Sequence, residues 1–140
     1  MPPAAKAAPQ KALHILIVDD NLDQVHSLAF LLSHSGHAVD YAINATVAMD
    51  LAERLQPDVI VLDVALPDGS GLDLCQRIRQ FDQTTPILFY SAAAYATDHD
   101  LAMKCGAQAY LVKPTQPSEL CDLVTELIEE SQHTSRCARA

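Results

Sequence analysis

Three carboxylates in this chain are placed where they could meet at one point. Asp19 and Asp20 directly follow the apolar run at 13–18, and Asp63 directly follows the apolar run at 58–62. If both runs are parallel strands, their carboxyl ends lie at the same edge of a sheet, where ligands bind in open α/β folds. Like charges brought together are unfavourable unless a cation joins them. The spacing therefore predicts a cation-binding site.

Two further polar residues follow later apolar runs. Ser91 comes after the run at 86–90, and Lys113 comes after the run at 108–112. A cluster of oxygen ligands without His or Cys suits a hard divalent ion such as Mg²⁺, which Mn²⁺ can replace. In formal charge the three carboxylates contribute −3, while one divalent ion and Lys113 together contribute +3. A loaded site would be neutral and could then accept an anion.

Each of these residues has an ordinary structural explanation when it is taken alone. An aspartate at a strand-to-helix junction is often only a helix cap, and a serine after a strand is usually a turn residue. Lys-Pro is a common loop dipeptide. Five polar residues of complementary chemistry at the same end of four strands are not explained by capping, so we interpret them together as one site.

The elements that would position these residues alternate along the chain. Short, continuous apolar runs predict five strands that are buried on both faces, near 13–18, 38–42, 58–62, 86–90 and 108–112. Segments of helical period lie between and after them, with start signals at Asn21, Asn44, Ser70, Thr97 and Pro117. Strict alternation predicts a three-layer α/β fold, with a five-stranded parallel sheet and helices on both of its faces.

Length and composition indicate one domain. The 140 residues are 49% hydrophobic, which is enough to build a single core without disulfide bonds. We expect a disordered N-terminal segment at 1–12, a domain at 13–130 and a flexible C-terminal tail at 131–140. The four cysteines form no C-x-x-C pair and no zinc-ligand spacing, which indicates reduced thiols in a cytoplasmic protein.

Charge and hydropathy argue against two classes of partner. The net charge is −9 and the nine Lys and Arg residues are scattered, whereas a nucleic-acid surface needs clustered basic residues. No run of 18 apolar residues exists that could span a membrane. We therefore expect no direct contact with nucleic acid or membrane. The aromatic side chains expected in the core are Phe30, Tyr41, Phe81 and Phe89.

The motifs also agree, in order and spacing, with those of a known family. They are Asp19-Asp20, the segment from Asp63 to Gly71 with Pro67 inside it, Ser91-Ala92 and Lys113-Pro114. In this set the chain resembles the receiver domain of two-component response regulators, over about 13–128. The resemblance implies a (βα)5 flavodoxin-like fold with strand order 2-1-3-4-5, an order that periodicity alone leaves open.

The resemblance implies a phosphoryl acceptor and its metal ion. Asp63 would accept a phosphoryl group from a histidine kinase or a histidine phosphotransfer protein and form an aspartyl phosphate. Asp19, Asp20, Asp63 and the backbone carbonyl of Ala65 would hold Mg²⁺.

It also implies residues that bind the phosphoryl group and respond to it. Lys113, Ser91 and Ala92 would surround the group, and Ser91 and Tyr110 would form a switch. That switch would reshape the face made by the fourth helix, the fifth strand and the fifth helix. Pro114 is the candidate for a cis proline that aims the lysine inward.

The function that these features predict is a phosphorylation-dependent signalling switch acting through an unidentified downstream protein. It would be no enzyme beyond its own phosphoryl transfer and autodephosphorylation. One alternative is an aspartyl-phosphate phosphatase like the haloacid dehalogenases, which would need Asp-x-Asp after the first strand and a substrate cap. The other is a receiver-shaped interaction module without phosphorylation, which would normally have lost an acid or the lysine.

Overall fold

The five predicted strands form one parallel sheet in the computed structural model, which describes residues 13–92, 96–113, 115 and 117–139. The strands are β1 (His14–Val18), β2 (Ala38–Ala42), β3 (Val59–Leu62), β6 (Ile87–Ser91) and β7 (Ala109–Val112). Their spatial order is β2-β1-β3-β6-β7, and every neighbouring pair is parallel. The predicted α/β class and the order 2-1-3-4-5 are therefore confirmed.

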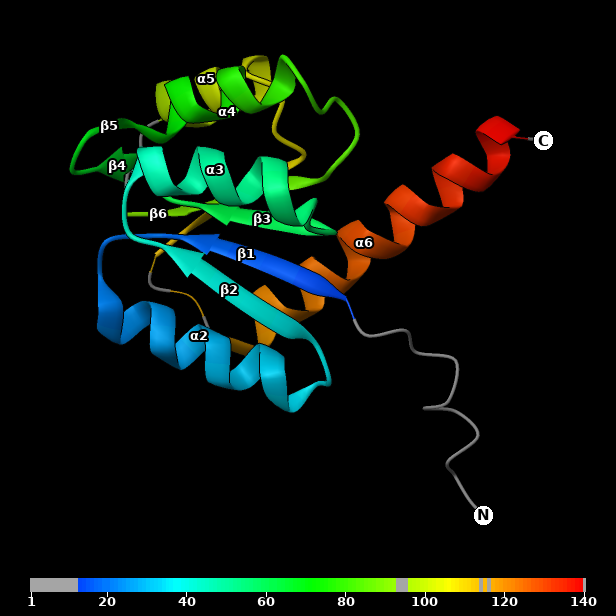
Figure 1. The fold of residues 1–140 in the computed structure, drawn as a ribbon, viewed down its shortest axis with the longest axis horizontal. Helices are drawn as coiled ribbons and strands as arrows, with labels where there is room; N and C mark the ends of the chain where they lie inside the picture. Colours follow the sequence, from blue (N-terminus) through cyan, green and yellow to red (C-terminus); the bar gives the residue numbers. More distant parts are fainter. Residues whose placement is uncertain (1–12, 93–95, 114, 116, 140) are drawn as a thin grey trace.

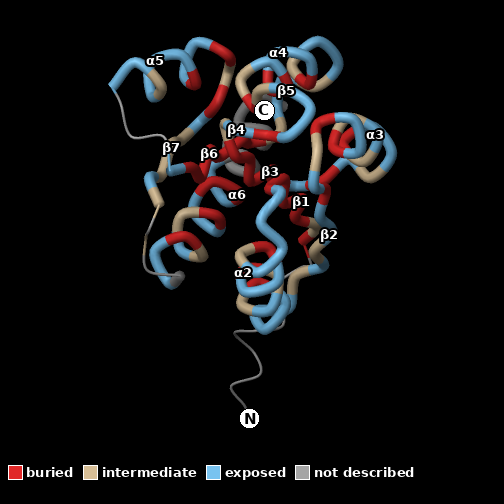
Figure 2. Tube along the Cα trace, turned by 90° about the vertical axis from the view of Figure 1, so that its left-hand side faces the viewer, coloured by how far each residue is buried: buried red, intermediate tan, exposed pale blue. Residues whose placement is uncertain are grey.

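Helices cover both faces of the sheet (Figure 1). One face carries α2 (Leu22–His34) and α6 (Pro117–Arg139), and the other carries α3 (Ala45–Leu55), α4 (Gly71–Arg79) and α5 (Ala96–Lys104). Because successive strand residues point to opposite faces, Ile15 and Ile17 pack under α2 and α6, while Leu16 and Val18 pack under the other three helices. Figure 2 shows β1, β3 and β6 largely buried between the two helix layers, whereas the edge strands β2 and β7 are partly exposed, so the prediction that all five strands are buried on both faces was wrong for these two.

Local capping explains where the helices begin. The side chains of Asn21, Asn44 and Ser70 each accept a hydrogen bond from a backbone N–H of the following first turn, at 3.2, 2.8 and 3.0 Å. Pro117 is the first residue of α6, as predicted. The turn that Asn21 caps directly follows β1 and also carries Asp19 and Asp20, so one short segment both starts α2 and supplies two carboxylates of the site.

The aromatic side chains correct one of our expectations. Phe89 is fully buried, but Phe30, Tyr41 and Phe81 are exposed, Phe30 by 65%. Phe30 lies on the outward face of α2 and contacts the ring of His34, with centroids 5.2 Å apart. Tyr41 belongs to β2, which is an edge strand. The prediction was wrong because residue type was given more weight than position on the helix face or in the sheet.

A short antiparallel pair follows β3, and the strand pattern did not predict it. It consists of β4 (Ala65–Leu66) and β5 (Gly69–Ser70), joined by a turn at Pro67 and Asp68. The pair occupies the segment between Asp63 and the start of α4. This segment therefore has a defined backbone arrangement rather than that of an open loop.

The last helix is longer than predicted. Helix α6 runs to Arg139, through the segment that we expected to be a flexible tail, because no Pro or Gly interrupts it there. Whether the segment is flexible stays a prediction, and residues 1–12 lie outside the described part of the chain. None of the helices in the described residues is long and apolar enough to cross a membrane.

Candidate functional site

The three predicted carboxylates meet at the carboxyl edge of the sheet. One carboxylate oxygen from each of Asp19, Asp20 and Asp63 lies within 4.8 Å of the other two. Asp19 and Asp63 are buried, and Asp20 is exposed. The backbone N–H groups of Asp19 and Asp63 donate to Ala42 and Val18 across the sheet, at 3.1 and 3.0 Å. The hydrogen-bond ladder of the sheet therefore continues through Asp19 and Asp63 and fixes the positions of their backbones.

Lys113 joins two of the carboxylates. Its Nζ lies 2.7 Å from Asp19 Oδ2 and 3.2 Å from Asp63 Oδ2, and its backbone N–H donates to the Ser91 carbonyl at 2.9 Å. The ammonium also lies 5.4 Å from the ring centre of Tyr90. Burial lowers the pKa of Lys113, but its hydrogen bond to Asp19 and the charge of Asp63 outweigh burial, so the pKa is raised above 10.5. The lysine is therefore a fixed positive charge at neutral pH.

The other oxygen of Asp63 faces hydrogen-bond donors. The buried Ser91 hydroxyl donates to Asp63 Oδ1 at 2.7 Å, and the Ala65 N–H donates to the same oxygen at 3.2 Å. Together with Lys113, these donors engage both oxygens and hold the carboxylate in one orientation. A carboxylate held in one orientation can act as a nucleophile or a metal ligand.

Gly71 allows the backbone after Asp63 to fold closely against α4. A Cβ atom at position 71 would lie 2.0 Å from the backbone oxygen of Asp63. The Gly71 N–H donates to the Val64 carbonyl at 2.6 Å, so the two segments are bonded as well as packed. Only glycine leaves room for this approach, and the requirement concerns space rather than an unusual backbone dihedral.

Tyr110 lies between the site and helix α5. Its ring packs against those of Phe89 and His99, with centroid distances of 5.9 and 5.8 Å. Burial and, less strongly, the charge of Asp98 raise the pKa of Tyr110, while a hydrogen bond with Ser91 opposes them. Tyr110 and Ser91 are therefore neighbours, as the predicted switch requires.

The residues at this edge fit a divalent cation. Three carboxylates within reach of one another form an all-oxygen donor set, which suits Mg²⁺ rather than zinc. The Ala65 carbonyl belongs to the same loop, and Ala65 and Ala92 are exposed beside the buried Asp63 and Ser91. Pro114, the predicted cis proline, lies outside the described residues.

Two contacts at the site were not predicted from the sequence. Tyr90 lies under the Lys113 ammonium, and Asp68 accepts hydrogen bonds from the first turn of α3. Asp68 occurs in a Pro-Asp-Gly stretch, which is a general turn signal and carries no information about a distant partner.

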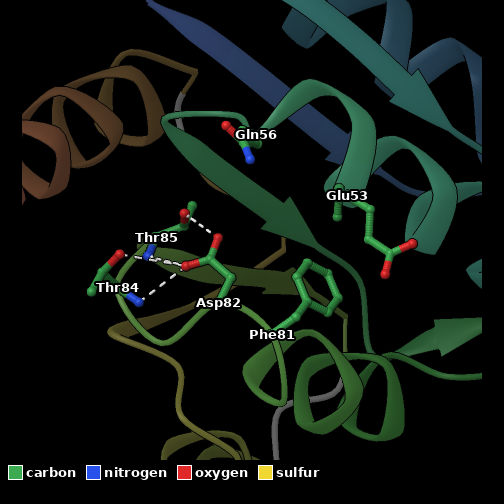
Figure 3. A pocket seen from close by; sticks show the side chains of 7 residues that line it. Glu53, Gln56, Phe81, Asp82, Thr84 and Thr85 are labelled. Carbon is green, nitrogen blue, oxygen red and sulfur yellow. Dashed lines mark hydrogen bonds between the residues drawn. The ribbon is translucent and has the colours of Figure 1, made fainter.

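A separate hollow of about 330 Å³ lies before the amino ends of β3 and β6, at the opposite edge of the sheet (Figure 3). It is lined by Ala52, Glu53, Gln56, Phe81, Asp82, Thr84 and Thr85. The Asp82 carboxylate accepts hydrogen bonds from the Thr84 and Thr85 backbones and from the Thr85 hydroxyl. The hollow lacks the group of three carboxylates that the described residues bring together at the edge with Asp63.

The fold and the site define a flavodoxin-like α/β domain with an acidic cation site and a lysine at the carboxyl edge of its sheet. The model of the response regulator receiver domain matches residues 15–125, and the chain belongs to this family.

Individual relatives agree with this assignment. The chain is 33% identical over 114 residues to the transcriptional regulatory protein CreB of Escherichia coli K12, covering 81% of this chain and 50% of CreB. It therefore spans only half of that relative. It is 38% identical over 116 residues to a 14.6 kDa protein of Leptolyngbya boryana, covering 81% of this chain and 88% of that protein.

The fold itself is similar to that of a solved structure, a CheY-like receiver domain protein from Methanospirillum hungatei JF-1. The TM-score is 0.86 at 24% sequence identity, covering 89% of this chain and 99% of the other. At that identity the likeness supports the fold alone.

Proposed function

We propose that this receiver domain is a phosphorylation-dependent signalling switch in which Asp63 accepts the phosphoryl group. The setting of the Asp63 carboxylate carries the proposal. Its two oxygens are engaged by Ser91 Oγ at 2.7 Å and by Lys113 Nζ at 3.2 Å, beside two further carboxylates. A carboxylate held in this way at a cation site is suited to attack an electrophilic phosphorus atom.

In the proposed reaction, an Asp63 oxygen attacks the phosphorus of a phosphohistidine on a histidine kinase or a histidine phosphotransfer protein. A P–O bond forms as the P–N bond breaks, and the imidazole leaves with the electron pair and takes up a proton. The Lys113 ammonium offsets charge on the transferring oxygens. Asp19, Asp20, Asp63 and the Ala65 carbonyl would hold Mg²⁺ or Mn²⁺, which supplies further positive charge to those oxygens.

The domain would act on no separate substrate. It would catalyse its own phosphorylation, and water would later hydrolyse the aspartyl phosphate, which returns Asp63 to the carboxylate. The signal would therefore last as long as the acyl phosphate survives. A cytoplasmic location, shared with the kinase domain that supplies the phosphoryl group, stays a prediction.

Ser91 and Tyr110 form the proposed route from the phosphate to a partner. A phosphoryl group on Asp63 adds charge and acceptor oxygens beside the Ser91 hydroxyl, which would then move its hydrogen bond from Asp63 Oδ1 to a phosphoryl oxygen. A change at Ser91 alters the space beside Tyr110, whose ring contacts His99 of α5. The face made by α5, β7 and α6 would shift between two populations, and an unidentified downstream protein would bind one of them.

Incubation with acetyl phosphate and Mg²⁺ tests the acceptor. Intact mass spectrometry should show one added phosphate on the wild type and none on Asp63→Asn. Asp58→Asn is the matched control, because Asp58 is an aspartate at the opposite edge of the sheet, and it should be labelled like the wild type. Single-site labelling that persists in Asp63→Asn would show that another residue is the nucleophile.

The metal assignment is tested by stability. A ligand that binds only the folded state stabilises it, so millimolar Mg²⁺ should raise the melting temperature of the wild type. Asp20→Ala should lose most of that increase, since Asp20 is the exposed member of the triad and removing its carboxylate costs no buried contact. An unchanged wild-type melting temperature would contradict the assignment.

The switch is tested by amide NMR before and after phosphorylation. Ser91→Ala should still be phosphorylated at Asp63, but its amide shifts at 97–123 should be smaller than those of the wild type. Equal shifts in the two proteins would mean that another route carries the signal.

A further inference from the structure

Asp68 connects the loop after the acceptor to a different part of the fold. Its Oδ1 accepts a hydrogen bond from the Ala45 N–H at 2.7 Å, and its Oδ2 accepts from the Thr46 N–H at 3.1 Å and the Thr46 hydroxyl at 2.8 Å. These donors belong to the first turn of α3. Asp68 lies on the turn between β4 and β5, more than twenty residues further along the chain.

Capping of α3 alone does not account for this contact. Asn44 already caps the helix by accepting from the Val47 N–H at 2.8 Å. The first turn of α3 contains no acidic residue of its own, so Asp68 supplies the negative charge that a helix N-terminus favours. The hydrogen bond from Ala45, followed by the one from the Thr46 hydroxyl, lowers the pKa of Asp68. The Asp68 carboxylate is therefore ionised at neutral pH.

The loop fastened in this way carries two groups of the phosphorylation site. Its first residues are Asp63 and Ala65, whose N–H donates to Asp63 Oδ1 at 3.2 Å. The far end of the loop is held by the bond from Gly71 N–H to the Val64 carbonyl. Leu66 anchors the β4 side of the loop in the core, whereas residues 67–69 of the turn are exposed, so the contacts of Asp68 with α3 are what fasten the exposed turn.

We propose that Asp68 is a positioning residue for the metal ion: by fastening the β4–β5 turn to α3, it holds the Ala65 carbonyl in place for Mg²⁺ beside Asp63. The inference rests on the proposed function, because it assumes that Mg²⁺ binds at the acidic triad. Residues behind the ligands of a metal site orient those ligands, and their loss weakens metal binding by about 10- to 100-fold.

The test compares two variants that each remove a side-chain acceptor from the N-terminus of α3. Asp68→Ala breaks the link to the loop, whereas Asn44→Ala removes the cap without touching the loop. Mg²⁺ is titrated into each variant of the 140-residue chain, and amide NMR shifts give the dissociation constant. Asp68→Ala should bind Mg²⁺ about tenfold more weakly than the wild type. Asn44→Ala should bind it as the wild type does, although both variants should melt at lower temperature.

A third variant keeps the comparison decisive. Asp68→Asn retains one acceptor oxygen for the Ala45 N–H, so its affinity should be restored to a value between Asp68→Ala and the wild type. If Asp68→Ala does not fold, Asp68→Asn against Asn44→Ala carries the test. Equal affinities in the Asp68 variants and Asn44→Ala would overturn the positioning role while leaving the proposed function intact. A wild type that shows no Mg²⁺-dependent shifts would overturn both.

Discussion

Replacement of Gly71 by alanine should damage the fold and the site together. The new Cβ would lie 2.0 Å from the backbone oxygen of Asp63 and 2.9 Å from its carbonyl carbon. An ordinary contact begins at 3.4 Å, so the start of α4 and the Asp63 backbone must separate by about 1.4 Å. Overpacking usually costs about 1–3 kcal/mol, and backbone yields less than a side chain. We expect the free energy of unfolding to fall by about 3 kcal/mol or more.

Urea denaturation measures this loss, and Gly36→Ala is the matched control. Gly36 has φ +92° with nothing within 4 Å of the added Cβ, so only backbone strain of about 1–2 kcal/mol is expected there. Mg²⁺-dependent amide shifts report the site in the molecules that stay folded. Gly71→Ala should lose these shifts and Gly36→Ala should keep them. If Gly71→Ala is no less stable than Gly36→Ala and still binds Mg²⁺, the argument from close approach is refuted.

Three further predictions follow from individual contacts. The pKa of Lys113 is raised in the folded state, so the stabilisation from its charged form is complete below pH 10.5 and is lost as pH rises through the folded-state pKa. Urea midpoints of the wild type should therefore decline in alkali, and those of Lys113→Met should lack this decline. An equal decline in both proteins would contradict the prediction. Burial raises the pKa of Cys75 to about 11, so its thiol should resist iodoacetamide at about pH 8 until urea unfolds the chain. Peptide mass spectrometry locates the label, and rapid labelling of Cys75 in the folded protein would contradict its burial. The Arg79 guanidinium donates to the backbone carbonyls of Gly106 and Asp82 at 2.8–3.0 Å. Arg79→Lys should therefore lower the free energy of unfolding, measured by urea titration, by about 2 kcal/mol. No measurable loss would mean that these hydrogen bonds do not stabilise the fold.

Local signals in the sequence predicted the elements of this fold well. Continuous apolar runs marked the three central strands, β1, β3 and β6, because a strand in the middle of a parallel sheet covered on both faces has no polar side. Asn21, Asn44 and Ser70 marked helix starts because a cap acts within three residues. Strand order depends on which distant segments pair, and periodicity contains no such information, so it came from the family resemblance. Phe30 was wrongly predicted to be buried, because the burial of a helix residue depends on which face of α2 it occupies.

In the site too, some residues could be predicted from the sequence and others could not. Asp19, Asp63 and Lys113 could be placed together because each follows a strand, and parallel strands end at one edge. The contact of Tyr90 with the lysine and the contact of Asp68 with α3 depend on side-chain directions across elements. Residue type and spacing leave those directions undetermined.

Helix α6 has a consequence for how this domain is made. It shares one face of the sheet with α2, and its Leu120, Val124, Leu127 and Ile128 bury strand residues such as Val59 and Leu88. During synthesis from the N-terminus, those strand residues are complete long before the helix that covers them leaves the ribosome. Until then the nascent sheet exposes apolar surface on which chaperones or other nascent chains can act. Covering of that face, and with it protection from aggregation, therefore depends on the part of the domain that is translated last.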